Sequence, residues 1–313
     1  MRRPLSTSRS AFSVGSVIAF VAVSIHPTRA GAQACCAGAA AVTPGRLAVH
    51  EDALVGFQSR AADIFASFSK DADYVPASAA EWDFEQDLFG ALRVARRAQV
   101  ALLAPVVQTY RRARGISDFG GGLGDLNLSG RYDFTLAGES EVVPGVGALV
   151  GVTFPTGRPT ESSDAANHPL AADATGTGAY QLNLGLALEQ TVGPWLFGVT
   201  GLYSKRTPRT IGGTKVTLGA QWTVLAGAAY TFSNDAALAL VASYSAEGNT
   251  EADGIEVPMS SRRIPLLTLA GLYPLNDPWR LQGGVFATPP LSSLGRNTPA
   301  NLGLVLALVR SWS

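Results

Sequence analysis

The sequence is poor in the residues that carry most metal and nucleophilic chemistry, and it has no charge bias. It contains two cysteines and three histidines in 313 residues, and 24 Lys and Arg balance 24 Asp and Glu. Cys35 and Cys36 are adjacent, so they cannot cross-link distant segments, which excludes a disulfide scaffold. A chain without a basic excess lacks the electrostatic footprint of nucleic-acid binding. We therefore expect no nucleic-acid partner.

Long apolar runs are missing beyond residue 25, where no stretch reaches the length of a membrane-spanning helix. The first residues differ, with a basic start, an apolar stretch over 11–25 and an Ala30-Gly31-Ala32 cleavage site. We predict a signal peptide over residues 1–32, with an uncleaved anchor as the alternative. A mature chain starting at Gln33 loses four of the 24 basic residues and keeps 24 acidic ones, a net charge of 20 − 24 = −4.

The two cysteines follow the predicted cleavage site closely. Acylation of Cys35 is one interpretation, but Ala32-Gln33-Ala34 lacks the leucine-like residue expected before a lipidated cysteine. A redox or metal role is another. We favour an exported tail over residues 33–52, located in the periplasm or in the lumen of the folded domain, which we predict to span 53–313.

A strict alternation of polar and apolar residues marks the segment 124–136. Asp125, Asn127 and Ser129 fall on one face of an extended chain, whereas Leu126 and Leu128 fall on the other. The same pattern recurs to the end of the chain. Because lipid offers no partner for backbone polar groups, strands with one apolar and one polar face span a membrane only as a closed barrel. The fold class predicted is therefore all-β, a transmembrane antiparallel up-and-down β-barrel.

The alternation predicts about twelve strands, the even number that single-chain bacterial barrels require. They span residues 53–66, 81–94, 98–111, 124–137, 142–154, 179–190, 194–205, 215–231, 236–246, 262–273, 278–288 and 301–312. The strand ends carry aromatic residues that fit interface girdles: Trp82, Tyr110, Phe154, Tyr230, Tyr273, Trp279 and Trp312. The first strand is the least regular, since 60–68 also fits a short helix.

The predicted connections alternate in length. Tight turns rich in Gly, Pro, Asn and Asp alternate with longer polar stretches at 67–80, 112–123, 155–178, 206–214, 247–261 and 289–300. Outer-membrane barrels have short periplasmic turns and long outer loops. The loop lengths therefore predict an outer-membrane location.

Three short motifs resemble a bacterial outer-membrane family linked to the meta-pathway of phenol degradation (the MetA type). They are Gly122-Leu123-Gly124-Asp125-Leu126, Phe154-Pro155-Thr156-Gly157 and Gly176-Thr177-Gly178. The resemblance implies a barrel that passes small molecules, hydrophobic and aromatic ones among them. The chain departs from such barrels at its end, which is Trp312-Ser313 instead of a terminal aromatic residue.

Charged residues on the predicted inner faces form the candidate site. Four acids share one face of the strand 81–94, opposite Trp82 and Phe84, and later strands add basic and acidic residues that complement them. The predicted pore-lining residues are Glu81, Asp83, Glu85, Asp87, Arg111, Asp125, Arg131, Asp133 and Arg280. Rings of charge in a pore select ions or orient solutes. The alternative is that they form salt bridges that merely fill a narrow barrel.

Catalytic and cofactor chemistry finds little support. Beyond the predicted signal peptide only His50 and His168 remain, and neither lies on a predicted strand, as a barrel lipase would need. The glycines of 120–124 precede a strand and not a helix, which excludes a phosphate-binding loop. No metal-ligand spacing is present, although loop carboxylates could bind calcium. We predict no catalytic residue, metal or cofactor.

The sequence therefore predicts an outer-membrane channel or transporter for passive passage of small molecules, not an enzyme. Its expected partners are outer-membrane lipid, the solute and the barrel-assembly machinery, and the oligomeric state is open. A lipase-like barrel and a structural or surface-interaction barrel are the alternatives. The loop 155–178 is expected either to fold inward and narrow the pore or to stay exposed.

Overall fold

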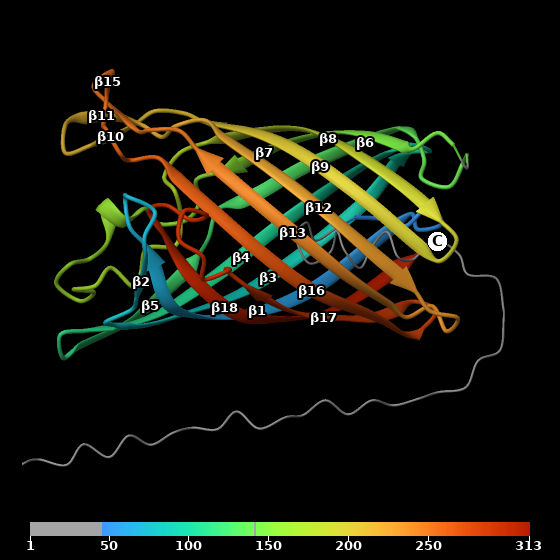
Figure 1. Ribbon diagram of the computed structural model, residues 1–313, viewed down its shortest axis with the longest axis horizontal. Coiled ribbons are helices and arrows are strands. Elements are labelled where there is room, and N and C mark those ends of the chain that lie inside the picture. Colours follow the sequence, from blue (N-terminus) through green and yellow to red (C-terminus); the bar gives the residue numbers. More distant parts are fainter. Residues whose placement is uncertain (1–45, 141) are drawn as a thin grey trace, which may run out of the picture.

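The computed structural model describes residues 46–140 and 142–313, which form a closed antiparallel barrel (Figure 1). The predicted signal peptide, both cysteines and residues 33–45 of the predicted tail lie outside the described residues. No helix in the described ranges is long and apolar enough to cross a membrane.

Twelve strand positions make the barrel wall of the described chain, and β18 pairs with β1 to close it. The wall consists of β1 (Ala53–Phe68), β3 (Ala80–Ala95), β4 (Ala98–Ala113), the consecutive pair β5 (Ile116–Leu123) and β6 (Leu126–Thr135), β7 (Gly145–Phe154), β8 (Gln181–Val192), β9 (Trp195–Arg206), β12 (Gln221–Thr231), β13 (Ala237–Glu247), β16 (Arg262–Asn276), β17 (Trp279–Ala287) and β18 (Thr298–Trp312). The predicted twelve-stranded barrel is confirmed, and β1 is a strand, not a short helix.

Burial alternates along each strand in the way that a lipid-facing wall requires. On β8, Leu182, Leu184 and Leu186 are 47–61% exposed, whereas Ala187 and Glu189 on the other face are buried. So many exposed leucines would be unfavourable in water, but outside a barrel they contact acyl chains. The apolar face is therefore outside and the polar face lines the lumen.

Outward aromatic residues gather near both ends of the wall. Tyr203 packs on Trp222 with ring centroids 4.7 Å apart at one end, and Trp195 packs on Tyr230 at 5.0 Å near the other. Such rings are typical of the two membrane interfaces.

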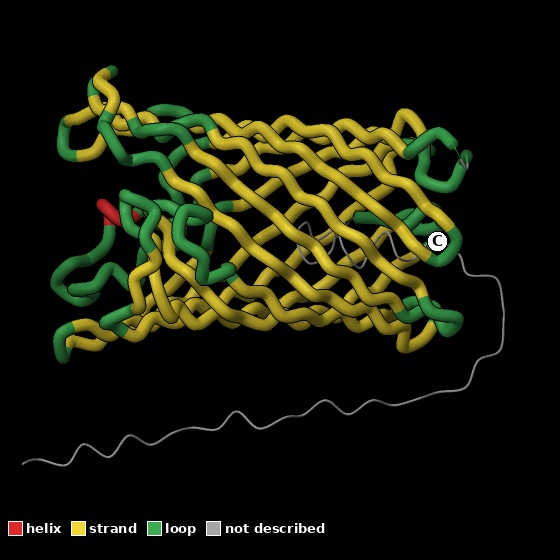
Figure 2. Tube along the Cα trace, viewed as in Figure 1, coloured by secondary structure: helices red, strands yellow, loops and turns green. Residues whose placement is uncertain are grey.

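The long connections lie at one end of the barrel and the short turns lie with the C-terminus at the other (Figures 1 and 2). The long connections carry β2 (Tyr74–Pro76), the 3-10 helix η1 (Thr160–Ser162) and a separate four-stranded sheet of β10 (Arg209–Ile211), β11 (Thr214–Thr217), β14 (Glu251–Ala252) and β15 (Ile255–Glu256). By loop length, this is the extracellular end.

Two predicted boundaries were wrong. The stretch 112–123 is not a long loop, because β5 pairs with the end of β4 around a tight turn at Arg114-Gly115, where φ is +50° and +83°. The stretch 215–231 is not one strand. Residues 214–217 belong to the separate sheet as β11, and the wall strand β12 begins only at Gln221.

Candidate functional site: the barrel lumen

The three motifs that carry the family resemblance meet around Asp125. Its carboxylate accepts hydrogen bonds from the backbone N–H of Gly157 (3.0 Å), the N–H of Thr177 (2.7 Å) and the hydroxyl of Thr177 (2.8 Å). A Cβ on Gly176 would lie 2.4 Å from Asp125 Oδ1, so glycine is needed there. Asp125 thus fixes both ends of the loop 155–178 to the start of β6.

The same loop is held against the lumenal face of β4 and β5, so it folds inward. Asp118 on β5 lies 2.9 Å from His168 Nδ1 and accepts the N–H of Leu170 at 2.9 Å. Arg111 on β4 donates to the carbonyl oxygens of Leu170 and Ala171, both at 2.9 Å. A Cβ on Gly120 would lie 2.6 Å from the backbone of Asp173, so the glycine-rich run of β5 is the surface on which the loop sits.

Within the loop, Asp173 organises the turn that follows η1. Desolvation opposes its ionisation, but hydrogen bonds from Ser163 and Arg158 outweigh that cost and lower the pKa of Asp173 to about 2. A charged Asp173 therefore stabilises the loop at neutral pH.

The four predicted acids of β3 descend the lumen wall, and each has a partner. Glu81 pairs with Arg111 at 2.7 Å and Glu85 with Arg60 at 3.1 Å. Asp83 accepts the hydroxyl of Thr109 at 3.0 Å, and Asp87 accepts the side-chain amide of Gln58 at 2.9 Å. Of the predicted pore-lining residues, these four acids form a single row along β3.

The periplasmic end of the lumen is filled by the segment 46–52, which precedes β1. Leu47 packs with Leu54, Phe89 and Val309 on one side of the barrel. Ala48 packs with Leu196, Ala229 and Ala237, which lie on β9, β12 and β13 across the lumen. Two adjacent residues that contact different sides of the wall place the segment across the lumen.

Ion pairs hold this segment in place. Arg46 pairs with Glu189 of β8, which also lies 3.2 Å from Arg131, and Arg131 is 2.7 Å from Asp133. Glu51 pairs with Arg280 of β17 and accepts the N–H of Ala48 at 2.8 Å. Burial opposes ionisation of Glu51, but the Arg280 guanidinium lowers the pKa of Glu51 below its ordinary value.

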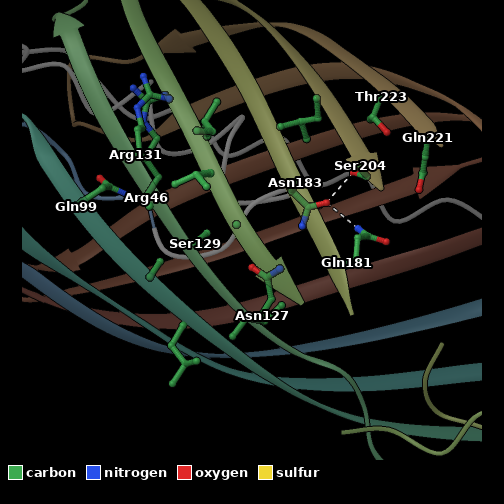
Figure 3. Close-up of a pocket in the computed structure, with 18 residues that line it drawn as sticks. Arg46, Gln99, Asn127, Ser129, Arg131, Gln181, Asn183, Ser204, Gln221 and Thr223 are labelled. Carbon is green, nitrogen blue, oxygen red and sulfur yellow. Dashed lines mark hydrogen bonds between the residues drawn. The ribbon is translucent and has the colours of Figure 1, made fainter. Parts of the chain in front are cut away.

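Above this segment the lumen opens into a cavity of about 400 Å³ (Figure 3). Asn183 accepts hydrogen bonds from Gln181 at 2.7 Å and Ser204 at 2.6 Å on the cavity wall. Arg46, Arg131 and Gln99 lie near one another at another part of the lining. Leu103, Leu149 and Leu202 add apolar surface between the polar groups. The cavity therefore offers hydrogen-bonding groups beside hydrocarbon.

The structure separates the predicted site residues into three groups. Glu81, Asp83, Glu85 and Asp87 form the upper row with Arg111, whereas Asp125 anchors the loop. Arg131, Asp133 and Arg280 bind the inserted segment or its partners, far along the lumen from most of the row. Sequence reasoning missed Arg46, Glu51 and Glu189; of these, only Glu189 had a signal, because the alternation of β8 points it inward.

Two observations in residues 46–140 and 142–313 concern the alternative chemistries. The His168 imidazole lies against Asp118 through Nδ1, and the hydroxyl of Ser163, five residues earlier in the chain, donates to Asp173. No group of three or more His, Cys, Asp or Glu in those ranges could hold a metal ion.

Comparison with known proteins bears on the fold. No protein-family profile and no curated protein matches the chain. The chain is similar to the solved structure of the COG4313 outer membrane channel from Pseudomonas putida F1. The TM-score is 0.70 and the sequence identity is 16%, and the match covers 87% of this chain and 98% of that one. The chain is an outer-membrane β-barrel. At this identity the similarity shows the fold alone, so the resemblance to the phenol-pathway family stays a prediction.

Further outer-membrane structures are more distant from this barrel. The translocator domain of the autotransporter NalP from Neisseria meningitidis has a TM-score of 0.45 and 10% identity, over 83% of this chain and 88% of that one. A NanC porin structure has a TM-score of 0.47 and 10% identity, over 82% of this chain and all of that one. These two likenesses are too weak to carry an argument about function.

Proposed function

We propose that this barrel is an outer-membrane channel for the passive passage of small molecules. The observation that carries the proposal is the lumenal cavity of about 400 Å³, which is lined by Arg46 of the segment 46–52 and by polar groups of β6, β8 and β9. A volume of this size fits a small organic molecule. Because hydrogen-bonding groups lie beside leucines, the solute that fits best combines an apolar or aromatic body with a polar group.

The mechanism consists of diffusion past two constrictions. A solute enters beside the loop 155–178 and passes the charged row of β3. It then occupies the cavity and leaves when the segment 46–52 moves. The ion pairs of Arg46 and Glu51 set how often this happens, because the segment must break them to leave the lumen.

Planar-bilayer recording and liposome swelling test the channel. We expect low conductance from the mature protein and higher conductance from a variant lacking residues 33–50, with swelling by small uncharged solutes. An inserted variant that has neither conductance nor solute uptake would contradict the proposal and favour a structural barrel. Lipid hydrolysis by the wild type that is abolished by His168→Ala would favour the alternative of a lipase-like barrel.

Assembly is the second part of the proposal. β18 ends on the outward aromatic Trp312 and pairs along its length with β1, so we expect it to be the strand that the barrel-assembly machinery binds. Trp312→Ala would then lower the amount of folded barrel in cells, measured as the fraction that migrates differently in SDS before and after boiling.

A further inference from the structure

A hollow of about 620 Å³ opens on the extracellular rim, separate from the lumenal cavity. It forms where the chain leaves the wall between β11 and β12. Gly219 and Gly248 approach so closely there that a Cβ on Gly219 would lie 2.3 Å from the Gly248 carbonyl oxygen. The wall strands β9, β13 and β16 continue past this point, and their outer faces border the hollow.

The outward residues around the hollow follow from strand register. Trp222 pairs with Tyr203 of β9 and with Ala246 of β13, and Ala246 pairs with Arg263 of β16. Lys205 lies two residues beyond Tyr203 on the same outward face. Trp222 is 62% exposed and belongs to the extracellular aromatic girdle. The two cations therefore lie at the level where lipid headgroups begin.

The charges around the hollow are unequal. Within residues 46–140 and 142–313, Lys205 and Arg263 are exposed and form no ion pair. Glu247 lines the hollow but is held by Arg206 at 2.9 Å on the lumenal side. Glu251, on the rim, is the other carboxylate that lines it. Arg262 also lines the hollow, but it pairs in register with the lumenal Glu247 and donates to the Asn297 carbonyl oxygen at 3.2 Å. On the outward side, Lys205 and Arg263 thus face one carboxylate beside the membrane.

We propose that this hollow binds the phosphate group of an anionic lipid in the outer leaflet. Arg263 and Lys205 donate hydrogen bonds to the phosphate oxygens, an interaction for which guanidinium and ammonium groups are both suited. The acyl chains extend along Trp222 and Ala246 towards the centre of the membrane. The contact compensates the positive charge that Glu251 leaves unbalanced at the edge of the membrane.

Native mass spectrometry of the mature protein in a nonionic detergent tests the site, with phosphatidic acid and phosphatidylcholine of the same acyl chains as probes. We expect preferential binding of phosphatidic acid, and about tenfold weaker binding by Lys205→Gln with Arg263→Gln, since each cation near a membrane surface contributes appreciably. Glu251→Gln is expected to strengthen binding.

Arg112→Gln is the matched control, because Arg112 lies two residues beyond the girdle residue Tyr110 on β4 and does not line this hollow. It should bind phosphatidic acid like the wild type. Equal binding of the two lipids by the wild type, or unchanged binding by a correctly folded double variant, would overturn the proposal. Displacement of the lipid by inorganic phosphate alone would also overturn it, by assigning the hollow to a soluble anion.

Discussion

Leu47 and Ala48 are neighbours in the chain, yet they pack on different sides of the barrel. Leu47 belongs to a buried cluster with Phe89 of β3, and Ala48 belongs to another with Ala229 of β12. A segment that contacts both sides fills the lumen at that level. Passage through the barrel therefore depends on how firmly the segment 46–52 is held.

Glu51→Gln is expected to loosen this segment. The change removes the charge that pairs with Arg280, and breaking a buried ion pair is strongly destabilising because the remaining charge is left uncompensated. Single-channel recording should show the open state about tenfold more often. This factor uses only a modest part of the free energy that the loss of a buried ion pair can cost. Glu139→Gln is the control, since Glu139 pairs with Arg97 outside the lumen. Equal effects of both changes would argue against the gating role.

Asp125→Ala is expected to release the loop 155–178. The substitution removes an acceptor of three hydrogen bonds, and hydrogen bonds to charged groups contribute about 2 kcal/mol each. Limited digestion with a glutamate-specific protease should then cut after Glu161 much faster than in the wild type, with the barrel still folded. Asp71→Ala, in another extracellular connection, should leave this cleavage unchanged. Slow cleavage in the Asp125 variant would mean that other contacts suffice to hold the loop.

The loop is expected to stay ordered in acid until about pH 2. The pKa of Asp173 is lowered from 3.8 to about 2, so its stabilising contribution is fully present above 3.8 and is lost as the pH falls through about 2. Pepsin should therefore spare the loop near pH 4 and cut it near pH 2. Asp173→Asn should be cut at both values. A wild-type loop that is already cut near pH 4 would contradict the assignment.

Leu186→Arg is expected to destabilise the barrel in lipid. Leu186 is central on β8, faces outward and is 61% exposed. An arginine on the lipid face near the membrane centre costs about 2–4 kcal/mol. Urea unfolding in phospholipid vesicles measures the difference, with Leu186→Ala separating the charge from the lost leucine. Equal stability of the two variants would place this face away from acyl chains.

Glu85→Lys with Asp87→Lys is expected to weaken or reverse cation preference in a conducting barrel. The pair of changes replaces two acids of the row with two cations and removes the partners of Arg60 and Gln58. Reversal potentials under a salt gradient measure the preference. Unchanged selectivity in a conducting channel would remove these residues from the constriction.

Local pattern was enough to predict the wall, because a strand between lipid and water must alternate with period two. Leu182 to Leu188 on β8 and Leu302 to Leu308 on β18 show that alternation in the sequence and face outward in the structure. The two wrong boundaries lie where alternation continues past the membrane. The residues of β5 extend a hairpin with β4, and those of β11 turn into a separate sheet.

The site was predictable only in part. Inward acids such as Glu81 and Asp83 follow from alternation, but their partners are set by register between strands. The three glycine-containing motifs were visible as separate stretches, and nothing local shows that they converge on Asp125.

The sequence by itself therefore determined the barrel, its two faces and the end that carries the long loops, because these depend on local period and connection length. Only the tertiary structure decided what lies inside. Residues 46–52 have no strand pattern, and their position depends on Arg46 meeting Glu189 and Glu51 meeting Arg280, across 143 and 229 residues of chain. Such pairs form only after the barrel closes and brings distant charges into one buried space.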